Sequence, residues 1–153
     1  MLIKPRHHHL ILSALAFAAL TACGSGGSSE SVTVAAPTTF TVDWEWKVSH
    51  KCSPTSPALV VSGIPSEAKS LQVAMVDLDL TSFNHGGGDV AHSGVASVTI
   101  PEGALKSYQG PCPPNFSGSG HNYQFTVKAI AADGQTELAR GSKTKAFSAS
   151  TAK

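Results

Sequence analysis

Hydrophobic and polar residues alternate strictly along the segment that starts at Thr39. Phe40, Val42, Trp44, Trp46 and Val48 are apolar, and the residues between them are polar. A period of two residues predicts a β-strand with one buried face. We expect the two tryptophans to pack in the core rather than to form a stacking platform, because they share this face with Phe40.

A second strong strand is predicted over Ser70 to Leu78. Leu71, Val73 and Met75 lie on one face of this strand. Its other face carries Ala74 and Val76, which are apolar too. Strands covered on both faces have nearly continuous apolar sequences. We therefore expect this strand to be central and buried on both sides.

Shorter patterns of the same kind predict the rest of the sheet structure. We expect strands at residues 59–61, 95–100 and 123–129, and a last one between Thr136 and Phe147. Glycine- and proline-rich loops separate them, and no stretch after the N-terminal region has a helical period beyond a single turn near Glu102 to Tyr108. This pattern predicts an all-β antiparallel sandwich with little or no helix.

The N-terminal region has the features of an export signal. Lys4 and Arg6 precede an apolar run from Leu10 to Leu20, which is shorter than the about 20 residues of a transmembrane helix. The run ends in Leu-Thr-Ala-Cys-Gly, which resembles the bacterial lipobox. We therefore predict a signal peptide over residues 1–22 and lipidation of Cys23. The alternatives are an ordinary core helix, or an ordinary signal with a chance cysteine.

The segment after Cys23 predicts a flexible tether. Residues 23–37 are rich in Gly, Ser and Ala without an apolar period, and a coil of this length reaches about 20 Å. We expect the sandwich domain to occupy residues 38–153. The protein would then be a membrane-anchored lipoprotein of the cell envelope, facing the periplasm or the exterior.

The cysteine count predicts a disulfide bond. Of the three cysteines, lipidation uses Cys23, which leaves Cys52 and Cys112 as a pair in an oxidising compartment. The alternative is two free buried thiols.

The charge of the chain excludes one class of partner. The 153 residues carry a formal net charge of +1, and no basic patch with interleaved aromatic residues is present. Nucleic acid is therefore not an expected partner. No serine lies in a Gly-x-Ser-x-Gly elbow, and we expect no enzymatic activity and no cofactor.

Polar residues gather where the predicted strands end. Asp77 and Asp79 follow the strongest strand, His85 precedes three glycines, and His121 and Tyr123 open a later strand. Imidazole and backbone N–H groups donate hydrogen bonds to anions, and a carboxylate fixes a histidine tautomer. These residues predict an anion pocket. The alternatives are that the aspartates only cap a turn and that His121 only bonds to backbone, while we expect His50 and His92 on the surface.

Three motifs carry a resemblance to a known family. Residues 56–65, Ser-Pro-Ala-Leu-Val-Val-Ser-Gly-Ile-Pro, resemble "SPpLsWsgvP", and residues 70–79, Ser-Leu-Gln-Val-Ala-Met-Val-Asp-Leu-Asp, resemble "SLalvmdDpDaP". Gly-Pro-Cys-Pro-Pro at 110–114, followed by His121 to Phe125, resembles "GPcPP…HrYxF". In this order the motifs are similar to those of the phosphatidylethanolamine-binding proteins, in their bacterial Raf-kinase-inhibitor-like branch.

The resemblance implies a β-sandwich with a small site for phosphate, acetate or a phospholipid headgroup. The residues that match the family's site are Asp77, Asp79, Gly110, Pro113, His121 and Tyr123. His85 is preferred to His92 as the remaining histidine, since its distance from Asp79 fits better and its glycines bring backbone N–H groups near a ligand.

The chain also departs from the family pattern. Val61 replaces a tryptophan, and Leu78 and Thr81 replace prolines. The C-terminal helix of many members is also missing. These departures imply a more open pocket of altered shape.

Two further functions stay open. Asp77, Asp79, His85, Asp89, His92 and His121 include metal-ligand types, so a metal-dependent enzyme is one alternative. They fall on predicted loops without the compact spacing of known metal motifs. The second alternative is an inhibitor or interaction protein for an envelope protease or another protein partner.

Overall fold

A computed structural model describes residues 39–153, in which eight strands form two antiparallel sheets. The smaller sheet has the order β1-β2-β5, with β1 at Thr41–Trp44, β2 at Leu59–Ser62 and β5 at Ser97–Ile100. The larger sheet has the order β6-β4-β3-β7-β8. Its strands are β3 Ser70–Asp77, β4 Asn84–Ala91, β6 Ser107–Tyr108, β7 His121–Ile130 and β8 Glu137–Phe147.

The all-β prediction is confirmed. The helical structure among the described residues is one 3₁₀ turn, η1 at Val48–His50. No helix in this part of the chain has the length and apolar character needed to span a bilayer. The lipidation site, the signal peptide and the tether all lie outside the described residues.

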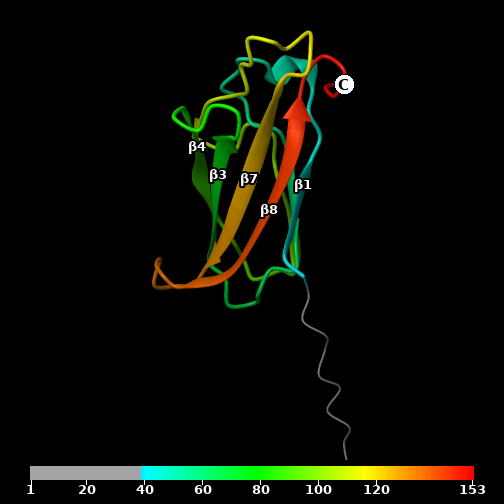
Figure 1. Ribbon diagram of the computed structural model, residues 1–153. Coiled ribbons are helices and arrows are strands. Elements are labelled where there is room, and N and C mark those ends of the chain that lie inside the picture. The colour runs from blue at the N-terminus through cyan, green and yellow to red at the C-terminus, as the bar shows by residue number, and fades with distance from the viewer. Residues whose placement is uncertain (1–38) are drawn as a thin grey trace, which may run out of the picture. The chain divides into compact units, whose positions relative to one another are not determined.

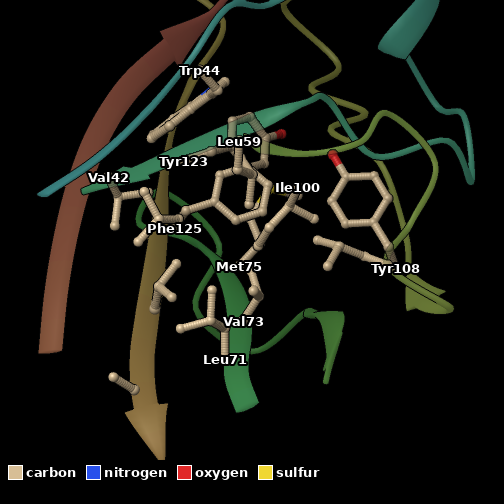
Figure 2. Packing of buried hydrophobic residues seen from close by; sticks show 14 of the residues in the cluster. Val42, Trp44, Leu59, Leu71, Val73, Met75, Ile100, Tyr108, Tyr123 and Phe125 are labelled. Carbon is tan, nitrogen blue, oxygen red and sulfur yellow. The ribbon is translucent and has the colours of Figure 1, made fainter. Parts of the chain in front are cut away.

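The core lies between the two sheets, where alternate residues of facing strands meet. Trp44 of β1 packs edge-on against Phe125 of β7, with ring centroids 5.0 Å apart. Figure 2 shows these two side chains with Leu59, Ile100 and Met75 around them. Trp44 and Trp46 are both buried, so the expectation of core packing is correct.

The open side between β1 and β8 is closed by side chains. Lys143 and Lys145 of β8 pair with Asp43 of β1 at 3.0 and 2.8 Å. Phe40 packs over Gly141, where a Cβ atom would approach its ring to 2.7 Å. Lysines on an edge strand hinder pairing with another chain.

Three expectations about individual segments are wrong. β3 is central, but Ala74 and Val76 on its outer face are exposed, because no element among the described residues covers that face. The glycine-rich segment after His85 is strand β4 and not a loop. Gly87 lies so close to β3 that a Cβ atom there would be 1.9 Å from the Val73 carbonyl oxygen.

The third correction concerns His50, which is buried rather than on the surface. Its ring packs against Trp46 at 6.0 Å, and its Nδ1 accepts the Lys47 N–H at 3.0 Å. Burial lowers the pKa of His50, although Glu102 acts in the opposite direction. The cause is η1, which interrupts the alternation after Trp46, leaves Val48 exposed and turns His50 inward.

The Cys52–Cys112 disulfide is present and joins the loop after η1 to the loop before β7. Two backbone hydrogen bonds link the same loops. Cys52 N–H donates to Pro111 O at 2.8 Å, and Gly110 N–H donates to Ser53 O at 2.9 Å. The disulfide therefore fixes the chain at the end of the sandwich where β3 ends and β7 begins.

Candidate anion site

The carboxylate of Asp77 organises the site. Asp77 is the last residue of β3 and is 2 % exposed. Its Oδ1 accepts the N–H groups of Asp79 at 2.9 Å and Leu80 at 3.1 Å. Asp77 therefore caps the turn after β3, as one alternative expected, and presents its second oxygen to the residues discussed next.

His121 forms the closest contact with this carboxylate. Its Nδ1 lies 2.7 Å from Asp77 Oδ2. β3 and β7 pair with Asp77 opposite Tyr123, which places His121 two residues further along at the same sheet end. Because an ionised carboxylate only accepts hydrogen bonds, Nδ1 carries the proton. Nε2 then has no hydrogen-bond partner among the described residues.

His85 approaches the same oxygen from β4. Its Nδ1–H donates to the carbonyl oxygen of Gln109 at 2.8 Å, so Nε2 is the ring nitrogen that faces Asp77 Oδ2 at 4.0 Å. The ring is buried, and it meets Tyr123 edge-on with centroids 5.3 Å apart. Two imidazoles from different strands thus converge on one carboxylate.

These contacts change the acidity of the central groups. Burial acts to raise the pKa of Asp77, but the hydrogen bonds from His121 and the Asp79 N–H outweigh it, and the pKa lies below its usual value. Burial, followed by the nearby Asp77 carboxylate, raises the pKa of the Tyr123 phenol well above its usual range. The site therefore contains a permanent carboxylate and a neutral phenol at physiological pH.

A cavity of about 200 Å³ opens over these groups. Polar side chains line one part of it and apolar side chains the other. The lining residues are Asp77, Leu80, Phe83, His85, Cys112, Pro114, His121 and Tyr123. No lysine or arginine is among them, so the histidines are the groups that can bring positive charge to a ligand.

The other residues predicted for the site lie next to this cavity and do not line it. Asp79 is exposed, and its Oδ2 accepts the backbone N–H of Asn122 at 2.6 Å and the Asn122 side-chain amide at 3.2 Å. Gly110 lines a neighbouring cavity of about 270 Å³ together with the disulfide. Pro113 is buried, and Pro114 takes its place in the lining.

Comparison with known proteins identifies the family of the chain. The family model described as "Phosphatidylethanolamine-binding protein" matches residues 30–152. The chain belongs to the phosphatidylethanolamine-binding protein family. Among solved structures, E. coli YbcL, described as a member of the mammalian PEBP family, is 22% identical, with a TM-score of 0.50. The match covers 71% of this chain and 98% of YbcL, and at this identity it supports the fold alone. No curated protein sequence matches.

Sequence analysis of this family member missed the apolar half of the site. Leu80, Phe83, Cys112 and Pro114 line the cavity. Cys112 and Pro114 belong to the family motif at 110–114, so this motif could have indicated that they line the site. Leu80 and Phe83 carry no such signal, since they enter the lining only because of the path of the loop after β3.

The residues around Asp77 include metal-ligand types, two of which are joined by a hydrogen bond. Asp77, Asp79 and His121 each have one potential ligand atom within 4.8 Å of the others. Two ligands at about 2.0–2.1 Å from a tetrahedral zinc lie roughly 3.3 Å apart, whereas Asp77 Oδ2 and His121 Nδ1 are 2.7 Å apart. A zinc ion bound through these two atoms of the PEBP-family domain would therefore require them to move apart.

His92 lies away from the cavity. Its Nε2 contacts the carbonyl oxygen of Val95 at 3.0 Å, in the loop between β4 and β5. It is partly exposed and does not line the site, which makes it a useful reference histidine for experiments.

Proposed function

We propose that this domain binds a small anion or a phospholipid headgroup in the cavity beside Asp77, without catalysing a reaction. The observation that carries the proposal is the His121–Asp77 pair. The negatively charged Asp77 carboxylate repels an anion. Its oxygens already accept hydrogen bonds from the turn N–H groups and from His121. Its role is to hold His121 with Nε2 as the nitrogen left for a ligand.

Protonation of the ring completes the site. With Nδ1–H donated to Asp77, Nε2 is a hydrogen-bond acceptor in the neutral ring and a donor in the charged ring. A charged ring is therefore required for Nε2 to donate a hydrogen bond to an anion. The Asp77 carboxylate holds the ring in place through Nδ1, and charge-assisted hydrogen bonds to an anion are among the stronger ones.

The experiment is a titration of the chain from Gly24 to Lys153, which includes the compact unit Ala35–Lys153. Amide chemical shifts are followed as phosphate, acetate and short-chain phosphatidylethanolamine are added. We expect saturable shifts around Asp77, His85 and His121 that disappear in His121→Ala. His92→Ala is the matched control and retains them. Absence of localised shifts with all three compounds, or equal shifts in His121→Ala, contradicts the proposal.

We further propose that the protein is a lipoprotein anchored through Cys23 and directed to the cell envelope. The support is the sequence Leu-Thr-Ala-Cys-Gly after a basic and then an apolar segment. Expression of the full chain in a bacterium with labelled palmitate tests this. We expect label in the wild type and none in Cys23→Ala, and a labelled Cys23→Ala protein contradicts the assignment.

A further inference from the structure

The loop that joins β3 to β4 is apolar and exposed. Leu78, Leu80 and Phe83 are 45 %, 48 % and 45 % exposed, all within six residues. Single exposed apolar residues are common on protein surfaces, whereas a contiguous group often marks an interaction site. The charged residue among them, Asp79, is held against Asn122 by two hydrogen bonds.

This apolar loop forms part of the mouth of the anion cavity. Leu80 and Phe83 line the cavity that His121 and His85 also line, and the Phe83 ring lies 4.6 Å from the His85 ring, centroid to centroid. A ligand seated at His121 thus meets apolar side chains directly beside its polar group. The matching ligand has a polar, anionic head attached to an apolar remainder.

The cavity is too small to enclose that remainder. Its volume of about 200 Å³ lies below the about 300–1,000 Å³ of pockets that enclose drug-sized ligands. A larger cavity of about 380 Å³ is formed by residues of β1, β2 and η1, and it shares no lining residue with the anion site. If the ligand is a phospholipid, its acyl chains must therefore remain outside the protein. Every methylene transferred from lipid to water costs free energy, so the chains stay in the bilayer.

We propose that residues Leu78–Phe83 form a membrane-docking loop, which enters the bilayer surface so that the cavity takes a headgroup from a lipid still in the membrane. This inference rests on the proposed headgroup-binding function. Leucine and phenylalanine side chains lose water-exposed area on entering the interface. The His85 and His121 rings then lie next to the phosphate layer.

The covalent length of the chain permits this docking while the protein is anchored at Cys23. β1 begins at the end of the sandwich opposite to the turn after β3 (Figure 1). Phe40 packs on Gly141, six residues along β8 from Phe147, which pairs with His121, so the two ends are roughly 20 Å apart. The 15 residues from Gly24 to Thr38 extend to about 50 Å at most. The loop can thus reach the bilayer that would hold the lipid anchor.

The test is a flotation assay of the unlipidated Gly24–Lys153 chain. The vesicles contain phosphatidylcholine alone or an equimolar mixture with phosphatidylethanolamine. Wild type is compared with the double variant Leu80→Glu/Phe83→Glu. The matched control is Val95→Glu, which places a glutamate at an apolar residue of similar exposure, 48 %, in the loop between β4 and β5. We expect the double variant to bind vesicles about tenfold or more weakly than wild type, and Val95→Glu to bind like wild type.

Further measurements separate the two proposals. Leu78→Glu changes an exposed apolar residue of the loop that does not line the cavity, so it should weaken vesicle binding while phosphate-induced shifts at His121 persist. Excess inorganic phosphate should reduce vesicle binding by wild type if headgroup and phosphate share the cavity. Vesicle binding that is equal in wild type and double variant, or equally lost in Val95→Glu, overturns the docking loop.

Two other outcomes also overturn the docking loop. The first is saturable phosphate shifts at His121 in a wild-type protein that does not bind vesicles, which leaves the anion site intact. The second is a wild-type protein that forms a dimer and does not bind vesicles, together with a double variant that is monomeric. This result assigns the loop to self-association. Absence of both phosphate shifts and vesicle binding contradicts the two proposals together.

Discussion

His121 donates its Nδ1 proton to the buried carboxylate of Asp77 across 2.7 Å. The two residues are 44 positions apart in the chain and are joined by the pairing of β3 with β7. Asp77 also accepts two backbone N–H groups from the turn that follows it. One carboxylate therefore shapes the turn after β3 and sets the tautomer of a histidine that lines the cavity.

Asp77→Asn should weaken anion binding. The amide still accepts the turn N–H groups through its oxygen, but it has lost the carboxylate oxygen that accepts the His121 Nδ1–H group. We expect the dissociation constant for phosphate, measured by chemical-shift titration, to rise about tenfold. Asp89→Asn, an exposed aspartate on β4 that does not line the cavity, should bind like wild type. Wild-type affinity in Asp77→Asn contradicts the assigned role.

The Asp77 carboxylate should also make stability depend on pH. Its pKa is lowered in the folded state, so it contributes stability above its unfolded pKa of about 3.9 and loses that contribution as pH falls through the lower folded value. Urea denaturation from about pH 5 down to about pH 2 should therefore show a smaller loss of unfolding free energy in Asp77→Asn than in wild type. Equal slopes in the two proteins would count against a stabilised carboxylate.

Loss of the Cys52–Cys112 disulfide should lower stability. The bond has a sequence separation of 60 residues, and the chain-entropy estimate for such a loop is about 4 kcal/mol. Urea denaturation of Cys52→Ala/Cys112→Ala should show a loss of this order relative to the oxidised protein. Wild-type protein with the disulfide reduced is the control for the effect of the substitutions themselves. It should have the same unfolding free energy as the double variant.

Gly120→Ala should be more damaging than Gly134→Ala. Both glycines have a left-handed backbone, with φ of +65° and +72°, and an alanine there costs roughly 1 kcal/mol. At Gly120 the new Cβ would also lie 1.8 Å from the carbonyl oxygen of Phe147, whereas nothing lies within 4 Å at Gly134. Thermal denaturation should rank wild type above Gly134→Ala and Gly134→Ala above Gly120→Ala. Similar melting temperatures for the two variants would contradict the packing described at Gly120.

The local patterns predicted most of the strands because a strand face depends on near neighbours alone. The alternation from Phe40 to Trp46 and from Tyr123 to Ala129 places the same residues inward in the structure. The sequence did not predict β4, because Gly86, Gly87 and Gly88 have no side chains that could show the alternation of apolar and polar residues. They are glycines because neighbouring backbones approach closely there, which is a property of the folded sheet.

By itself the sequence determined the all-β class, the inward faces of the regular strands, the pairing of Cys52 with Cys112 and the family to which the motifs belong. These follow from periodicity, residue count and short motifs. Only the tertiary structure decided that His121 and His85 meet at Asp77, that Gly110, Pro113 and Asp79 lie beside the cavity, and that Leu80 and Phe83 line it. Such contacts join residues from different strands and loops, and their positions depend on how the sheet pairs and how the turn after β3 folds.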